Sequence, residues 1–297
     1  MRKLLLACAV ALLPAQFAYS HGFVGDRFFP PTIATDDPFA TDELLLPSVS
    51  VFKDPGKPAA WEEDAGFEFD KEILPHFSLG VADQYIYQKP SSQSGAGGWD
   101  DLSLTAKYQL WQNDAHEAIV SVGLETDFGG TGNSNVGVDR FNTYVPTFYF
   151  GKGFGDLPDS LTALKPFAVT STLANSFPNK DDDSNQFQWG IALEYSLPYL
   201  EQNVADTGLP RPWRDMIPLV EFAMATNENR SQSGQTTGTI NPGVLWETPY
   251  FQVGGEAQIP VNGHTGPHVG AVLQLEIFID DIFPKVFGHP IFFGDQP

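Results

Sequence analysis

Apolar and polar residues alternate with a period of two along most of this chain. From Asp101 the sequence reads DLSLTAKYQL, in which apolar and polar positions alternate without a break. The runs QFQWGIALEYSL from Gln186 and VGAVLQLEIFID from Val269 repeat the pattern. Such alternation is typical of a β-strand with one apolar and one polar face.

About twelve segments of this kind can be marked, with boundaries good to a few residues. Short helical stretches are conceivable only near 157–164 and 199–206. The predicted strands span 44–53, 65–72, 77–88, 99–111, 117–128, 143–152, 166–174, 186–197, 216–226, 238–248, 251–260 and 268–280.

The connections between these segments alternate in length. The links near 73–76, 112–116 and 249–250 are short, whereas the long ones carry runs such as SSQSGAGG, GGTGNSNVG and NKDDDSN. This alternation is typical of an up-and-down transmembrane barrel, with turns at one end and loops at the other. The links 153–165 and 198–215 are longer than the pattern requires, and 261–267 is shorter.

Aromatic residues are placed as in a membrane barrel. Trp99 and Trp111 are twelve positions apart, which at ~3.3 Å per residue and ~40° tilt gives roughly 30 Å of height, comparable with an apolar band of ~25 Å. Trp189 and Trp246 fit the same girdle. A soluble sandwich or lipocalin-like barrel stays open, because alternation does not reveal which face meets water. Strand number, strand length and loop pattern favour an all-β fold, a transmembrane antiparallel up-and-down β-barrel of about 12 strands.

The first twenty residues predict a secretory signal peptide. Arg2 and Lys3 precede the apolar run LLLACAVALL, and Ala18-Tyr19-Ser20 supplies small residues for cleavage before His21. Residues 21–43 are rich in Pro, Asp and Phe without a period, and their four Phe predict packing, as a plug in the lumen or a cap on its periplasmic mouth. We therefore expect a signal peptide at 1–20, a periplasmic or plug-like segment at 21–43 and a barrel domain at 44–297.

Charge excludes several classes of protein. The 297 residues include 37 Asp or Glu and 16 Lys or Arg, a formal net charge of -21. So acidic a chain is a poor binder of nucleic acid, because binding needs Lys and Arg to displace counterions from phosphate. The single cysteine, Cys8, excludes a disulfide scaffold and a Cys-ligated zinc site, and it would leave with the signal peptide.

If the apolar faces meet lipid, the opposite faces line a lumen. That face is rich in Gly, Ala, Ser and Gln, which predicts a wet interior with room in it. A lumen lined by one sign of charge favours counter-ions of the other sign, so one hypothesis is a pore for cationic or neutral polar solutes. The alternative is that the acids pair with bases or tie strands together. The predicted lumen-lining residues are Glu68, Asp70, Lys107, Glu125, Glu194, Glu221, Glu247, Glu256 and Glu276.

Residues 98–129, GWDDLSLTAKYQLWQNDAHEAIVSVGLETDFG, resemble a known family. Asp101 to Leu104 with Lys107-Tyr108, and Gly123-Leu124 with the Gly-rich end of the segment, are similar to the bacterial outer-membrane barrels grouped as the MetA-pathway of phenol degradation family. The resemblance implies an outer-membrane channel, in some cases linked to aromatic compounds. It implies no ligand-binding residue, and Trp99-Asp100 departs from the family pattern.

Other chemistry has little support in the sequence. Asp181-Asp182-Asp183 could bind Ca²⁺ but is more ordinary as a solvated loop. His21 could begin a copper site, although only two residues match such families. The motifs of serine hydrolases, zinc peptidases and P-loop proteins are missing. We expect no enzyme activity, no metal and no cofactor.

The predicted function is passage of small solutes through an outer-membrane channel, and the solutes could be aromatic, hydrophobic or cationic. A non-conducting barrel serving structure or surface interaction is the first alternative, and a soluble periplasmic all-β protein is the second. The expected partners are outer-membrane lipid and lipopolysaccharide, a small-molecule solute and the barrel-assembly machinery during biogenesis.

Overall fold

A computed structural model describes residues 22–55, 59–90 and 94–293. The predicted signal peptide and His21 lie outside these residues. Within them, no helix is long and apolar enough to cross a membrane.

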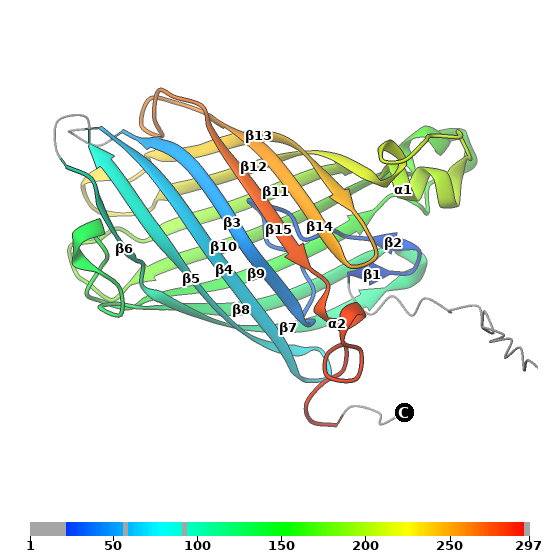
Figure 1. Ribbon diagram of the computed structural model, residues 1–297, viewed down its shortest axis with the longest axis horizontal. Helices are drawn as coiled ribbons and strands as arrows, with labels where there is room; N and C mark the ends of the chain where they lie inside the picture. Colours follow the sequence, from blue (N-terminus) through cyan, green and yellow to red (C-terminus); the bar gives the residue numbers. More distant parts are fainter. Residues whose placement is uncertain (1–21, 56–58, 91–93, 294–297) are drawn as a thin grey trace, which may run out of the picture.

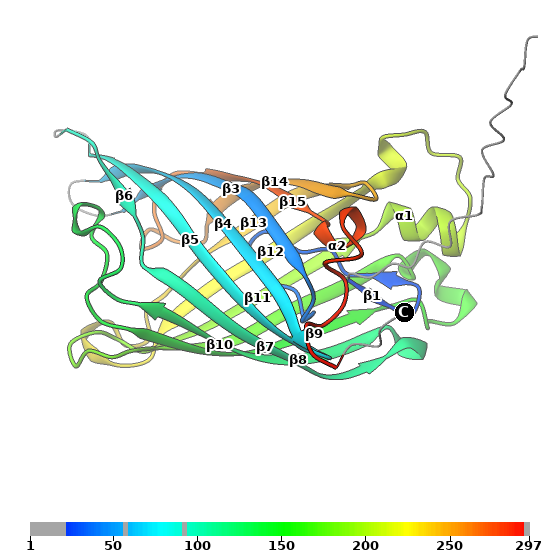
Figure 2. The same ribbon diagram turned by 60° about the horizontal axis from the view of Figure 1, so that its bottom comes forward.

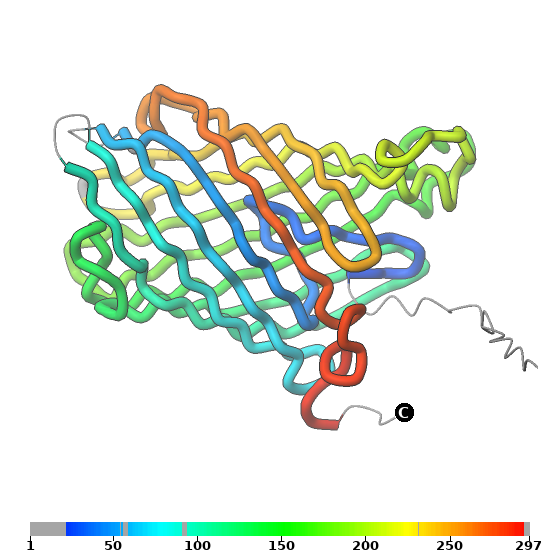
Figure 3. Tube along the Cα trace, viewed as in Figure 1, coloured from blue at the N-terminus to red at the C-terminus, as the bar shows by residue number. Residues whose placement is uncertain are grey.

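The strands form one closed antiparallel barrel (Figures 1 and 3). From β3 to β5 and from β7 to β15 each strand pairs with the next along the chain, β5 pairs with β7, and β15 pairs with β3 to close the ring. β6 pairs with the end of β5 just before β7 begins, so β6 and β7 occupy one place in a barrel of twelve strands. The strands are β3 (Glu43–Asp54), β4 (Ala60–Leu74), β5 (Phe77–Pro90), β6 (Ala96–Trp99), β7 (Leu102–Asn113), β8 (Ala118–Phe128), β9 (Thr143–Gly153), β10 (Phe167–Pro178), β11 (Gln186–Tyr195), β12 (Met216–Asn227), β13 (Thr236–Glu247), β14 (Phe251–Pro260) and β15 (Gly270–Ile277).

The predicted fold class is confirmed, and all twelve predicted segments are strands. β4 is the largest boundary difference, since it starts at Ala60 rather than near 65. Outward Glu63 interrupts the apolar pattern between Trp61 and Ala65, so periodicity missed this stretch. The two conceivable helical stretches become the short helices η3 (Asp159–Leu164), α1 (Leu197–Tyr199) and η4 (Leu200–Val204).

The two ends of the barrel differ. The turn end carries the connections 75–76, 114–117, 154–166, 196–215 and 248–250. It also holds the short strands β1 (Phe23–Val24) and β2 (Arg27–Phe28), the start of β3 and the end of β15 (Figures 1 and 2). The remaining connections, among them 129–142 and 228–235, form the loop end. The two overlong links predicted from sequence are the ones that contain η3, α1, η4 and η5 (Trp213–Asp215).

The outer wall of the barrel is apolar and exposed. Leu273 on β15 is 61% exposed and Leu193 on β11 is 45% exposed, whereas their inward neighbours Gln274 and Glu194 are buried. Exposed leucines, valines and aromatics repeat this on every side of the barrel. A continuous apolar outer wall is typical of a barrel that meets lipid.

Towards the turn end the interior of the barrel is a packed core rather than a wet lumen. At the turn end, Val24, Phe29 and Phe39 pack with the inward side chains Ile119 and Ala168. Phe28 and its neighbours make a second cluster with inward residues of β12 and β13, namely Ile217, Leu219 and Leu245, together with Phe278. Apolar side chains of the lead segment thus pack against apolar inward side chains of the strands.

Candidate functional site

The chain crosses the barrel lumen before it enters the first long strand. Residues 31–38, which we call the plug, touch opposite parts of the wall. Ser121 on β8 donates its hydroxyl to Pro38 O, and Gln252 on β14 donates to Pro31 O at 2.7 Å. The strands that contact the plug lie on opposite sides of the barrel. Four strands lie between β14 and β7, and three strands, β9, β10 and β11, lie between β8 and β12. The plug therefore spans the interior, as the blue segment inside the barrel in Figure 3 shows.

Glu221 on β12 holds the centre of the plug. Its fully buried carboxylate accepts the backbone N–H groups of Ile33, Ala34 and Thr35 at 3.0, 2.6 and 3.0 Å. Three consecutive backbone donors aimed at one group form a small anion-binding concavity. A predicted lumen charge is thus used to bind the chain's own backbone.

Lys107 on β7 binds the far end of the plug. Its ammonium group lies 3.0 Å from the Asp36 carboxylate and donates to Asp37 O at 3.2 Å. Asp37 is buried, and its carboxylate accepts Phe39 N at 2.7 Å. Burial raises the pKa of Asp37 to about 7, although the nearby Lys107 ammonium acts in the opposite direction.

Arg27 fixes the lead segment below the plug. Its guanidinium group is fully buried, lies 3.2 Å from Glu117 and donates to Pro166 O at 3.1 Å. It also stacks 3.5 Å from the ring centroid of Tyr199. The Tyr199 hydroxyl donates to Glu117 at 2.7 Å, and burial together with this carboxylate raises the pKa of Tyr199. A buried, hydrogen-bonded ion pair thereby fixes the lead segment to the turn-end connections 114–117 and 154–166.

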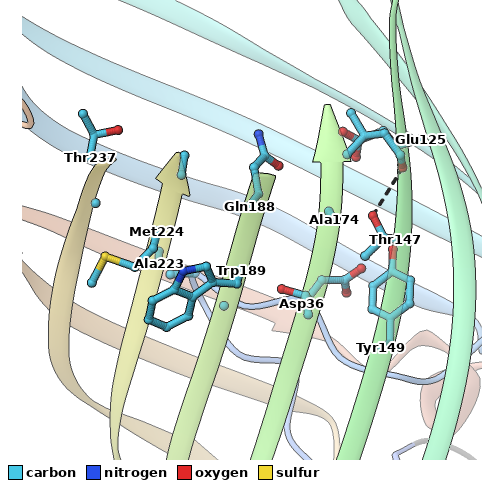
Figure 4. Close-up of a pocket in the computed structure, with 16 residues that line it drawn as sticks. Asp36, Glu125, Thr147, Tyr149, Ala174, Gln188, Trp189, Ala223, Met224 and Thr237 are labelled. Carbon is cyan, nitrogen blue, oxygen red and sulfur yellow. Dashed lines mark hydrogen bonds between the residues drawn. The ribbon is translucent and has the colours of Figure 1, made fainter. Parts of the chain in front are cut away.

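Above the plug, towards the loop end, the lumen stays hollow. The largest of four cavities found there measures about 460 Å³ and is floored by Ala34 and Asp36. Figure 4 shows Asp36, Glu125 and Tyr149 on one side of it and Met224 and Thr237 on the other. Its remaining lining is small or uncharged, and comes from β9 to β13.

Three further cavities, of about 220, 290 and 330 Å³, continue around the plug and under the loops. None of the described residues that line the four cavities is Lys, Arg or His. The lining carboxylates are Asp36, Asp37, Glu43, Glu62, Glu68, Asp83, Asp100, Asp101, Glu125, Asp127, Asp139 and Glu276. The open part of the lumen is therefore uniformly acidic.

The structure places the nine predicted lumen residues on inward strand positions. Glu68 and Glu125 line cavities, and Glu276 borders the cavity beside the plug although it is itself buried near the turn end. Asp70, Lys107, Glu194, Glu221 and Glu256 are buried. Glu247 pairs in register with buried Gln252 near the turn end. The nine residues are therefore split between positions that border cavities and positions that are buried in the protein.

The four predicted girdle tryptophans lie near strand ends. Trp99 and Trp111 are each 49% exposed, at the loop end and the turn end respectively. Trp246 stacks edge-on against Phe251 near the turn end. Trp189 shares the strand face of exposed Leu193, and it also borders the largest cavity.

Sequence reasoning missed the plug ligands and the loop acids. Arg27, Asp36 and Asp37 lie in a segment without a period, so nothing indicated which way they point. Asp100 and Asp139 lie outside the regular strands. A signal existed only in composition, since the lead segment combines four Phe with several acids.

No group of three or more metal-ligating side chains is assembled within the described part of the chain. The Asp181 to Asp183 run sits in the β10–β11 loop, where Lys180 pairs with Asp183 at 3.1 Å.

Fold and site together define a membrane-spanning β-barrel with an internal plug and an acidic outer half. No protein-family model and no curated protein matches the sequence, so the resemblance of residues 98–129 to the phenol-degradation family is not confirmed. Solved structures do match.

The COG4313 outer membrane channel from Pseudomonas putida F1 superposes with a TM-score of 0.53 at 14% identity, over 84% of this chain and all of that one. KdgM porin, also solved in complex with disordered oligogalacturonate, gives a TM-score of 0.46 at 10% identity over 79% of this chain and 98% of that one. NanC porin gives 0.47 at 9% identity, over 78% and 98%. At these identities the likeness concerns the fold.

Proposed function

We propose that this protein is a non-enzymatic outer-membrane channel for passive or facilitated passage of small solutes, exported by an N-terminal signal peptide. The observation that carries the proposal is the set of four cavities above and around the plug, whose described lining includes twelve carboxylates and no Lys, Arg or His. A cavity of this kind inside an apolar wall is a place for solute rather than for structure.

The same lining supports a preference for cationic or neutral polar solutes over anions. Low-dielectric walls focus the field of like charges and concentrate counter-ions. An aromatic part of a solute would be accommodated too, because inward Val145 and Tyr149 line the cavity of about 460 Å³. An amine with a small ring or short chain fits both features.

The plug is the observation that favours the alternative, a non-conducting barrel. A solute entering the acidic half meets Ala34 and Asp36 at the floor. Passage therefore needs either a narrow path beside the plug or its displacement.

Reversal potentials in planar bilayers under a salt gradient test the proposal. The wild-type protein is expected to select cations, and the inward pair E125Q and D127N on β8 to lower the cation preference. An anion-selective wild type would overturn the solute preference. A barrel that stays silent even when the plug is weakened would support the non-conducting alternative.

Placement of the barrel in the outer membrane also implies the other proposed partners. The apolar wall would meet outer-membrane lipid and lipopolysaccharide, and insertion would use the barrel-assembly machinery. A folded barrel of this type is expected to migrate faster on gels before heating than after, whereas identical mobility would favour a soluble protein.

A further inference from the structure

The C-terminal segment fills a gap in the barrel wall. β3 starts at Glu43, paired with Asp70, whereas β4 continues to Leu74. The carbonyl oxygens of Glu72 and Ile73 accept the backbone N–H groups of Ile291 and Phe292 at 3.2 and 2.9 Å. The chain after β15 thus occupies the place beside β4 that β3 leaves when the chain enters the lumen.

Asp42 ties this segment to the wall. Its buried carboxylate lies 2.7 Å from Lys71 Nζ and accepts the backbone N–H of Gly288 at 2.7 Å. Lys71 donates in turn to His289 O at 2.8 Å. These contacts keep the segment against the barrel.

An aromatic contact shows which side of the wall the segment covers. Phe69 and Lys71 alternate along β4 with the buried, inward Asp70, so both belong to the outer face. The Phe287 ring packs edge-on against Phe69 at 6.2 Å, and Lys71 lies 5.7 Å from its centroid. The segment therefore lies on the outside of the barrel, where Figure 2 shows it crossing below α2 (Ile279–Ile282).

The side of the segment away from β4 is apolar and uncovered. Its large exposed side chains are Phe283, Val286, Ile291, Phe292 and Phe293, the last 88% exposed. Leu74, at the end of β4, is also exposed, which joins this surface to the apolar outer wall. Two basic residues, Lys285 and His289, are exposed among them.

We propose that residues 283–293 form a membrane-binding surface whose partner is the headgroup–acyl boundary of phospholipid at the turn end. The surface is continuous with the lipid-facing wall, so its natural neighbour is the same bilayer at a shallower depth. Aromatic side chains favour that boundary, and a lysine there reaches outward to the headgroups. The segment would thus replace a wall strand and anchor the barrel rim. This inference rests on the proposed membrane placement but not on conduction.

Depth-dependent quenching tests the proposal. Cys8, the single cysteine of the chain, is replaced by Ser, and one environment-sensitive fluorophore is attached at V286C, L273C or Q202C in the full-length barrel. Leu273 belongs to the exposed outer wall, and Gln202 is exposed in the β11–β12 connection at the same end. Vesicles of phosphatidylcholine carry a nitroxide either on the headgroup or midway along the acyl chain.

The label at 286 is expected to be quenched roughly twofold more by headgroup nitroxide than by chain nitroxide, whereas the label at 273 should show the reverse. Quenching at 286 as weak as at 202 would place the surface in water and overturn the proposal, leaving a periplasmic protein as its partner. Preferential quenching by chain nitroxide would also overturn it. If the label at 273 is not quenched, the membrane placement itself fails, which separates the two hypotheses.

Discussion

Replacing Glu221 by Gln should loosen the plug without disturbing the barrel. The carboxylate accepts three backbone N–H groups from residues 33–35 at 2.6 to 3.0 Å, and it is fully buried. A hydrogen bond to a charged group contributes about 1.5–3 kcal/mol, and glutamine keeps one accepting oxygen of the same shape. We therefore expect the substitution to cost plug docking about 2–3 kcal/mol, or roughly 30- to 150-fold in its docking equilibrium.

Single-channel recording measures this effect directly. E221Q should open larger or more frequent conductance states than the wild type. E194Q is the matched control, because Glu194 is an equally buried inward carboxylate on the neighbouring strand, and it accepts a hydrogen bond from Thr170 of the wall at 3.1 Å. Unchanged conductance in E221Q, with the barrel still folded, would refute the idea that this carboxylate holds the plug. An equal increase in E194Q would show that loss of any buried charge suffices.

Three further substitutions test other contacts. R27L leaves Glu117 buried without its guanidinium partner, so the barrel should lose about 3–5 kcal/mol in urea unfolding; wild-type stability would mean that the ion pair contributes nothing. When the plug is docked, burial raises the pKa of Asp37 from an ordinary 3.8 to about 7. The charged groups around it are Lys107, Asp36, Asp70 and Glu43. Docking should therefore be strongest below about pH 4, weaken up to about pH 7 and then level off. Conductance should therefore rise between about pH 4 and pH 7 in the wild type, and D37N should remove this pH dependence. If D37N keeps the pH dependence, a group other than Asp37 causes it. L173R puts a charge on the exposed outer wall and should cost about 2–4 kcal/mol in vesicles, whereas tolerance equal to that of a loop substitution would argue against lipid contact.

Most of the fold could be predicted from the alternation of apolar and polar residues, because inward and outward positions repeat regularly along each strand. On β7, Lys107 and Thr105 are buried while Leu104 and Tyr108 are exposed, as the period of two predicts. The same rule gives the side of the wall that each strand residue faces. The aperiodic lead segment offered no such rule, so its Phe residues indicated packing but not the partner.

Periodicity also cannot tell a lumen charge that faces solute from one that faces the protein. Glu125 and Glu221 share the same inward parity on their strands, yet one lines the largest cavity and the other binds the plug backbone. The difference depends on where residues 31–38 pass, which is a long-range contact. The packed interior of the turn half also depends on long-range contacts, because inward Ile217 and Leu245 pack with Phe28 of the lead segment.

Because the carboxylates are divided in this way, ion selectivity and closure of the lumen depend on different residues. In the turn half, Glu117, Glu221 and Asp42 each bind a donor supplied by the chain itself. In the loop half, the cavity-lining acids Asp101, Glu125 and Asp127 have no described base among the residues that line the same cavities. Selectivity should therefore follow substitutions near the loops, and closure should follow substitutions near the turns. A variant such as E221Q that raised conductance while keeping the wild-type reversal potential would demonstrate that the two halves act independently.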